Sequence, residues 1–335
     1  MFIVTGGAGC IGSAVIWALN KRGITDIILV DGVGHPEKEK NIASLDYYKQ
    51  EDKDTFLDRI INSNIPWSVD VIFHMGGCSS TIEQDESFLT KNNYDYTKLL
   101  ATYALNKDIR FIYASSAATY GSGTNGFSDE MDPSTLNPLN LYGHSKQKFD
   151  MWAKEQGALD RIVGLKYFNV FGPGEYHKKE MLSMVRRGYL QVLDSGKIRL
   201  FKSYNPKYAD GEQERDFLYI KDAVEMTLFF LDHPDIAGLF NAGTGVVRTW
   251  NELSEEVFKA MDREVDVEYV DMPASIRNQF QYRTCAKIDK IRNAGYSKPI
   301  ISLEDAITDY IQNYLFFNKR LTYRTMIFII SIKHY

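Results

Sequence analysis

Residues 2–12 read FIVTGGAGCIG, with glycines at positions 6, 9 and 12 between a short apolar stretch and a helical pattern over residues 13–22. Glycine allows a tight turn and lets a pyrophosphate approach the backbone with no Cβ in the way. The start of the following helix offers unpaired N–H groups and a partial positive charge. A glycine trio alone would mark only a turn. Together with the strand before it, the helix after it and Asp31 at the end of the next strand, it predicts a dinucleotide site.

Apolar runs and helical patterns continue to alternate through the first half of the chain. Such alternation is typical of βαβ units, so the sequence predicts an α/β fold with a doubly wound parallel sheet of Rossmann type. Further strands are expected at residues 27–30, 69–74, 111–115 and 162–167, and further helices at residues 54–62 and 92–106.

The pattern becomes less regular beyond about residue 172. Short strands at residues 198–201, 217–220 and 239–242, helices at 224–231 and 250–261, and a loop at 202–214 predict a smaller α/β lobe. We expect three parts, which are a nucleotide-binding domain mainly at 1–171 with later segments returning to it, a substrate-binding lobe mainly at 172–317, and an atypical tail at 318–335.

Composition narrows the classes of function. The chain has 335 residues, 44% of them hydrophobic and 25% charged, which is typical of folded globular proteins. The net charge of −5 gives no reason to expect nucleic acid as a partner. Three widely spaced cysteines form neither a disulfide framework nor a metal-ligand pattern, and no signal peptide is evident, so the cytoplasm is the expected location.

The tail combines basic residues with an apolar run at 326–332. That run is too short to span a bilayer, which needs roughly 20 residues, so no membrane insertion is expected. One interpretation is a basic amphipathic tail that touches a membrane or a partner subunit. The other is a ragged terminus outside the fold. The basic residues are Lys319, Arg320, Arg324 and Lys333.

The spacing of charged residues leaves the choice of cofactor open. A carboxylate at Asp31 normally binds a ribose 2′-hydroxyl and favours NAD. Lys38 and Lys53 could instead neutralise the 2′-phosphate of NADP, or they could be solvated surface residues. A second turn of small residues, MGGCSS at 75–80, follows another expected strand. Ligands of open α/β sheets bind at such strand ends.

Tyr142 and Lys146 stand four residues apart in YGHSK, so at the start of a helix they share one face. A tyrosine of pKa about 10 is a poor base at neutral pH, but a nearby ammonium and an oxidised nicotinamide would favour its phenolate. Ser116, in the strand-end segment YASSAATYG, can donate a hydrogen bond to a substrate oxygen. These three residues predict a hydride-transfer site, whereas Ser115 is expected to be structural.

The segments TGGAGCIG, ASSAATYG, YGHSK and KYFNVFGP resemble the extended short-chain dehydrogenase/reductase family over residues 1 to about 317. Within it, HMGGCSST, His177-Lys178 and Arg215-Asp216-Phe217 look most like the ADP-L-glycero-D-manno-heptose 6-epimerases. The resemblance implies one tightly bound NADP per subunit, with NAD possible. Cofactor contacts are implied at Gly6, Gly9, Cys10, Ile11, Gly12, Asp31, Gly32, Lys38, Lys53, Met75, Gly76, Gly77, Cys78, Ser79, Asn92, Tyr142, Lys146, Val170 and Lys178.

The resemblance also implies a reaction. ADP-D-glycero-β-D-manno-heptose would be epimerised at C6″ by transient oxidation and re-reduction, for the inner core of lipopolysaccharide. Ser116, Tyr142 and Lys146 match the catalytic residues and Lys178 matches a second acid/base. A homo-oligomer, commonly a pentamer, is implied. Substrate contacts are implied at Ser116, Asn169, Glu180, Arg187, Phe201, Lys202, Ser203, Tyr204, Arg215 and Phe280.

Some positions depart from the usual residues of these epimerases. Met75 replaces a glutamate, Glu180 a serine, Arg187 a histidine and Phe280 a tyrosine. The departures lie on the substrate side, so another nucleotide-sugar 4-epimerase or a reductase is an alternative. A dehydratase would carry acidic residues where Ala117 and Ala118 stand. A non-catalytic NADP-binding sensor is a further alternative, although such proteins usually lose the tyrosine or the lysine.

Overall fold

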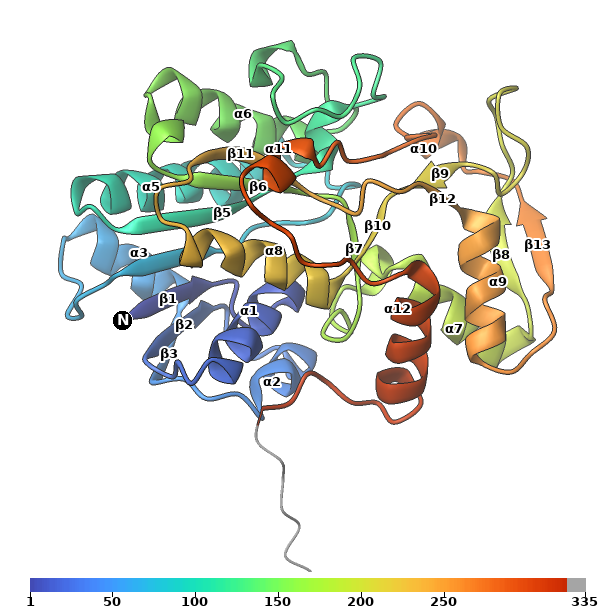
Figure 1. Cartoon of the computed structure of the whole chain (residues 1–335), viewed down its shortest axis with the longest axis horizontal. Coiled ribbons are helices and arrows are strands. Elements are labelled where there is room, and N and C mark those ends of the chain that lie inside the picture. The colour runs from blue at the N-terminus through green and yellow to red at the C-terminus, as the bar shows by residue number, and fades with distance from the viewer. Residues whose placement is uncertain (324–335) are drawn as a thin grey trace, which may run out of the picture.

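The computed structural model describes residues 1–323, and its centre is a sheet of seven parallel strands (Figure 1). In order across the sheet they are β11, β6, β5, β4, β1, β2 and β3. The predicted doubly wound Rossmann-type fold is confirmed. The strands are β1 (Phe2–Thr5), β2 (Ile27–Asp31), β3 (Lys49–Asp52), β4 (Val71–His74), β5 (Arg110–Ser116), β6 (Val163–Tyr167) and β11 (Gly238–Ala242).

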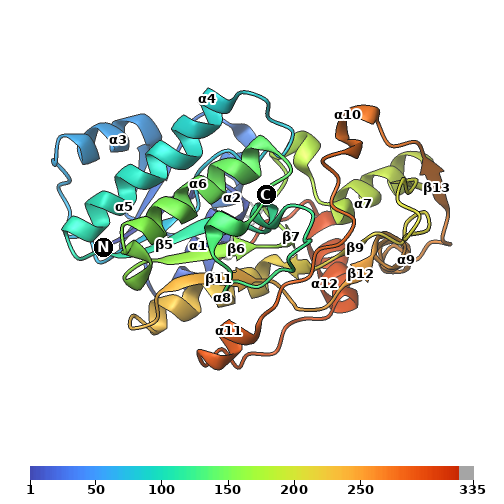
Figure 2. The same ribbon diagram turned by 90° about the horizontal axis from the view of Figure 1, so that it is seen from above.

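Helices cover both faces of the sheet, and each face has its own apolar cluster. One face carries α3 (Lys53–Ile61), α5 (Tyr96–Asn106) and α6 (Leu141–Glu155). The other carries α1 (Cys10–Lys21) and α8 (Ile220–Asp232), which pack against each other. Figure 2 shows α3, α5 and α6 on one side of the sheet and α8 on the other. Short α4 (Glu86–Leu89) and a π-helical segment, Thr90–Asp95, lead into α5.

The smaller lobe lies beyond the carboxyl ends of the strands (Figure 1). Its main elements are α7 (Met184–Ser195), α9 (Trp250–Ala260) and the parallel strands β8 (Ile198–Phe201) and β13 (Val267–Val270), while short strands, short helices and loops connect it to the main sheet. The connecting elements are α10 (Ala274–Arg277), the pair β7 (Asn169–Phe171) and β10 (Phe217–Tyr219), the pair β9 (Glu214–Arg215) and β12 (Arg248–Thr249), α11 (Asp289–Asn293) and α12 (Leu303–Asp309).

The structure corrects one expected location and contains several elements that were not expected. Residues 239–242, expected in the smaller lobe, form β11, which pairs with β6 at the edge of the main sheet. Among the elements that were not expected from the sequence are α2 (Pro36–Ile42), β3 and α7. The strand β3 reads KQED, which has no apolar alternation, and it exists because β2 pairs with it along its length. The domain boundaries near 171 and 317 stay a prediction.

The expectation that the chain after Phe317 lies outside the fold is wrong for residues 318–323. Leu321 is buried, and its carbonyl oxygen lies 3.4 Å from the Ser44 hydroxyl. The Trp17 indole donates to the carbonyl of Thr322 at 3.2 Å. Arg324, the apolar run at 326–332 and Lys333 lie outside the described residues. In the described part of the chain, no helix has the length and apolar character needed to cross a membrane.

Candidate active site

The glycine turn after β1 is held by contacts that exclude side chains. Gly6 has a φ of +65°, and a Cβ there would lie 2.6 Å from the Cα of Gly76. A Cβ at Gly12 would lie 2.1 Å from the carbonyl oxygen of Gly6. The N-cap of α1 is Gly9, with no side-chain hydrogen bond, so the first N–H groups of the helix remain available to an anion. The turn therefore has the local geometry of a phosphate-binding loop.

A cavity of about 400 Å³ opens beside this turn, at the carboxyl ends of β1, β2 and β4. Every residue expected at the cofactor lines it except Tyr142, Lys146 and Val170. The lining residues that were expected are Gly6, Gly9, Cys10, Ile11, Gly12, Asp31, Gly32, Lys38, Lys53, Met75, Gly76, Gly77, Cys78, Ser79, Asn92 and Lys178.

Sequence reasoning missed four residues of this cavity, namely Val30, Phe88, Tyr96 and His177. Tyr96 was expected only as part of the apolar stripe of its helix. Its hydroxyl is buried and has no hydrogen-bond partner among the described residues. A buried unpaired hydroxyl is unfavourable by about 1–3 kcal/mol, which suits a site that a polar ligand completes. The glycine turn and this hydroxyl both fit a bound dinucleotide.

Asp31 is already engaged in the protein alone. Its carboxylate accepts hydrogen bonds from the Ala8 amide at 3.0 Å and the Gly32 amide at 2.8 Å, and it pairs with Lys38 Nζ at 2.7 Å. Lys53 donates to the side-chain oxygen of Asn92 at 3.1 Å. Both lysines line the cavity, and the Lys53 side chain remains 39% exposed. Lys38 offsets the negative charge of Asp31, which alone would disfavour a 2′-phosphate.

Ser116, Tyr142 and Lys146 lie where β5 ends and α6 begins. Asn140 caps α6 by accepting a hydrogen bond from the Gly143 amide at 2.8 Å, which places Tyr142 and Lys146 in the first turns of the helix. The Ser116 hydroxyl accepts a hydrogen bond from the Ala118 amide at 3.1 Å and lies close enough to Tyr142 to affect the pKa of the tyrosine. Lys146 Nζ donates to the Ala114 carbonyl at 2.9 Å. A Cβ on Gly77 would lie 3.6 Å from this ammonium, so the group adjoins the wall of the cofactor cavity.

Burial shifts the pKa values of both Tyr142 and Lys146. Burial raises the pKa of Tyr142, the Ser116 side chain lowers it in part, and the Cys78 thiol adds to the rise. Burial also lowers the pKa of Lys146 to about 8, against opposing contributions from Asp150 and Cys78. The expected stabilisation of the phenolate by Lys146 and an oxidised nicotinamide together stays a prediction. Tyr142 is poised as a neutral hydroxyl until further positive charge arrives.

A buried polar network behind these residues was not anticipated. The Asp150 carboxylate accepts hydrogen bonds from Lys166 Nζ at 2.6 Å, Ser115 at 2.8 Å and Tyr113 at 2.8 Å. Lys166 also donates to the Thr119 hydroxyl at 2.8 Å, and Thr119 in turn donates to the Ser116 carbonyl at 2.8 Å. The network ties α6 to the end of β5 and so fixes Ser116 relative to Tyr142. It also gives Ser115 the structural role that was expected.

Lys178 lies across the cofactor cavity, in the loop after β7. Burial would lower its pKa, but Cys10 and the fully buried Glu175 carboxylate raise the pKa above its usual value. Glu175 is held by the Ser183 hydroxyl at 2.7 Å and the Tyr310 hydroxyl at 3.0 Å. Lys178 is therefore an ammonium at neutral pH and can act as a proton donor.

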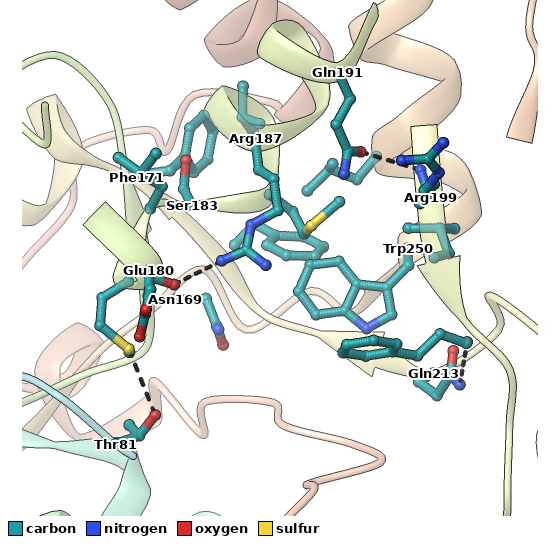
Figure 3. A pocket seen from close by; sticks show the side chains of 18 of the residues that line it. Thr81, Asn169, Phe171, Glu180, Ser183, Arg187, Gln191, Arg199, Gln213 and Trp250 are labelled. Atoms are coloured by element: carbon teal, nitrogen blue, oxygen red, sulfur yellow. Dashed lines mark hydrogen bonds between the residues drawn. The ribbon is translucent and has the colours of Figure 1, made fainter. Parts of the chain in front are cut away.

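A second cavity, of about 590 Å³, lies between β7, α7 and α9 (Figure 3). Five residues expected at the substrate line it, and Val170, expected at the cofactor, lines it as well. The Arg187 guanidinium projects into it and donates to the backbone carbonyl of Glu180 at 2.6 Å. This bond goes to the backbone of Glu180 and not to its carboxylate. The five expected residues are Asn169, Glu180, Arg187, Phe201 and Phe280.

The other expected substrate residues lie outside this lining. Lys202 and Tyr204 both bind Asp271, at 3.2 Å each, and the Ser203 amide donates to Asp210 at 2.6 Å. Ser116 remains at the end of β5. Arg215 is buried behind the wall, with its guanidinium 5.1 Å from the Phe280 ring and 5.4 Å from the Trp250 ring. Burial lowers the pKa of Arg215 to about 10.

Sequence reasoning missed much of the polar and aromatic lining of the second cavity. Trp250, Gln191, Arg199 and Gln213 all contribute to it. Their only signal was their position in the less regular half of the chain, because they come from separate elements that the fold brings together. Among the described residues, no group of histidine, cysteine and carboxylate side chains could hold a metal ion.

A parallel sheet with a dinucleotide cavity at its carboxyl ends, and with a tyrosine and a lysine one helical turn apart beside it, defines a nucleotide-dependent α/β enzyme of the short-chain dehydrogenase/reductase type. The sequence pattern of the NAD dependent epimerase/dehydratase family matches residues 2–243, and the chain belongs to this family. Membership implies a nicotinamide cofactor.

Known proteins similar to this chain carry a more specific name. An ADP-L-glycero-D-manno-heptose-6-epimerase of Nitratidesulfovibrio vulgaris is 50% identical over 318 residues, covering 94% of this chain and 98% of the relative. One of Fusobacterium nucleatum is 44% identical, with the same coverage. The crystal structure of the Helicobacter pylori ADP-L-glycero-D-manno-heptose-6-epimerase matches with a TM-score of 0.78 and 27% identity, covering 93% of this chain and 95% of that one.

Proposed function

We propose that the chain is an ADP-L-glycero-D-manno-heptose 6-epimerase, an isomerase that interconverts the D-glycero and L-glycero forms of ADP-heptose at C6″ for lipopolysaccharide inner-core synthesis. The observation that carries the proposal is 50% identity to a protein of that name over 98% of its length. The Ser116–Tyr142–Lys146 group beside the cofactor cavity supports it. The cation at Arg187 supports a diphosphate substrate next to Glu180.

The residues have separate tasks in this reaction. When bound, the nicotinamide supplies reversible hydride transfer. Tyr142 takes the proton of the C6″ hydroxyl, and the Ser116 hydroxyl holds the oxygen that becomes a carbonyl. The second cavity holds the nucleotide end of the substrate while the side chain at C6″ rotates. Lys178, an ammonium on the other side, donates a proton when the opposite face of the carbonyl is reduced.

The first test is a proton NMR time course of the purified protein with ADP-D-glycero-D-manno-heptose and no added cofactor. Conversion to the L-glycero epimer is expected, because a tightly bound dinucleotide would serve repeated turnovers without net consumption. UDP-galactose, a substrate for a 4-epimerase, serves as the comparison and should remain unchanged. If ADP-heptose fails to react even after NADP is added, the substrate is a different nucleotide sugar.

We also propose NADP as the cofactor, with Lys38 and Lys53 at its 2′-phosphate. Replacing both lysines by alanine is expected to raise the dissociation constant of NADP by at least about a hundredfold, because hydrogen bonds to charged groups contribute about 1.5–3 kcal/mol each. The constant for NAD should change far less. Fluorescence titration with NADPH and NADH measures both constants.

Lys40→Ala is the matched control for this prediction. Lys40 lies in α2, as Lys38 does. It is exposed, pairs with Glu37 at 2.6 Å and does not line the cavity. It should change neither constant. Equal weakening of NADPH and NADH in the double variant would remove the two lysines from the phosphate site. The cytoplasmic location and the homo-oligomeric assembly stay predictions.

A further inference from the structure

The chain after α12 returns to the nucleotide-binding domain and passes beside α2, as the red segment in Figure 1 shows. Residues 318–322, here called the C-terminal strap, are held by three hydrogen bonds to their backbone carbonyls. The Tyr176 hydroxyl donates to Lys319 at 2.8 Å, Ser44 donates to Leu321 at 3.4 Å, and Trp17 donates to Thr322 at 3.2 Å. The strap therefore touches α1, the end of α2 and the loop that carries Tyr176.

Arg320 is the central residue of the C-terminal strap, and it is only 8% exposed. Its guanidinium pairs with Glu37 at 2.6 Å and lies 3.4 Å from the centre of the Tyr176 ring. The guanidinium of Arg186 lies 3.8 Å from the same ring. Tyr176 is thus stacked against two cations, an arrangement that is favourable when the groups are shielded from water. One buried side chain joins α2 to the loop after β7.

Both structures that Arg320 joins are walls of the cofactor cavity. On one side, Lys38 follows Glu37 in α2, and on the other, His177 and Lys178 follow Tyr176. The walls also meet directly. Asn41 of α2 donates to the Ala8 carbonyl in the glycine turn at 3.0 Å and to the Gly174 carbonyl at 2.8 Å. The His35 and His177 rings lie 6.1 Å apart, edge to face.

We propose that Arg320 is a positioning residue that keeps these two walls together and thereby retains the bound dinucleotide between turnovers. A dinucleotide that contacts both Lys38 and the loop at residues 177–178 can leave only when α2 and the loop separate. Neither Asn41 nor Arg320 lines the cavity, so both act on its walls from outside the lining. The inference rests on the proposed function only in requiring that a nicotinamide dinucleotide occupies this cavity.

The experiment is a displacement measurement on the full-length protein. The protein is loaded with NADPH, mixed with excess NADP, and the loss of bound nicotinamide fluorescence gives the rate of release. Arg320→Ala should release NADPH at least about tenfold faster, a factor that corresponds to 1.4 kcal/mol. Arg320→Lys can still pair with Glu37 but stacks poorly on Tyr176. Its release rate should therefore lie between those of the unaltered protein and Arg320→Ala.

Arg22→Ala is the matched control, because Arg22 follows α1 and pairs with Asp232 at the end of α8 at 2.8 Å, and neither residue lines the cavity. Its release rate should equal that of the unaltered protein, and this distinguishes a positioning role from a general loss of stability. If the unaltered protein binds NADPH and Arg320→Ala releases it at the same rate, the inference about Arg320 is wrong. If the unaltered protein binds neither NADPH nor NADH, the proposed function fails as well.

Discussion

Replacing Tyr142 by phenylalanine is expected to lower turnover by about a hundred- to ten-thousandfold, the range found for removal of a general acid–base group, while the dinucleotide stays bound. The change removes only the hydroxyl that exchanges a proton with the substrate. The ring remains and continues to fill its place at the start of α6. Because Lys146 bonds the Ala114 carbonyl and not the tyrosine, its ammonium should keep its position.

The measurement for Tyr142→Phe has two parts, namely the NMR rate with ADP-heptose and the amount of nicotinamide released on denaturation. Tyr48→Phe is the control, since Tyr48 is 67% exposed and lies outside both cavities. Turnover in Tyr142→Phe close to that of the unaltered protein would exclude Tyr142 as the proton-exchanging group. Loss of the nicotinamide would instead assign the tyrosine a role in holding the cofactor.

The second large effect is expected on stability. Lys166 and Asp150 form a buried ion pair, 1% and 0% exposed respectively, at 2.6 Å. Removing one partner leaves the other charge buried without its counterion, which destabilises proteins by about 3–5 kcal/mol. Lys166→Met should therefore lower the free energy of unfolding by this amount. Urea titration followed by circular dichroism measures the change.

A control and a repair variant sharpen this prediction. Lys154 lies on α6, as Asp150 does, and forms an exposed ion pair with Asp132. Lys154→Ala breaks this pair, and the urea midpoint should hardly move because solvent replaces the lost partner. Combining Lys166→Met with Asp150→Leu removes both charges and should recover much of the lost stability. If Lys166→Met alone is as stable as the unaltered protein, the network does not hold the end of β5.

Local sequence patterns predicted the parts of the site that depend on local geometry. The glycine turn, Asp31 at the end of β2 and the four-residue spacing of Tyr142 and Lys146 each follow from a strand or a helix and its period. The strand order then brings them together, because the carboxyl ends of parallel strands share one edge. Most of the other cavity residues, including Lys38 and Lys53, were implied only by the family resemblance, because spacing alone left both lysines open.

The rest depends on contacts between distant segments. Asp150 is the centre of a buried network because the fold brings Lys166 and Tyr113, from β6 and β5, next to its carboxylate. The sequence around Asp150 does not indicate this. Trp250 enters the second cavity because α9 packs against α7, and no short pattern in either helix signals this. The sequence analysis treated Arg320 as one of the basic residues of the tail, because its contacts with Glu37 and Tyr176 cannot be predicted from the sequence. Charge and hydropathy describe a residue alone and cannot identify its long-range partner.

The two cavities share no lining residue, although both lie at the carboxyl edge of one sheet. The cofactor and the sugar nucleotide would therefore occupy separate cavities, with Lys38 of α2 and the loop residues His177 and Lys178 on the cofactor side only. The electrons removed from each substrate molecule then return to that same molecule before it departs. The turnover rate of such an enzyme would depend on the concentration of sugar nucleotide. It would not depend on the ratio of oxidised to reduced nicotinamide cofactor in solution.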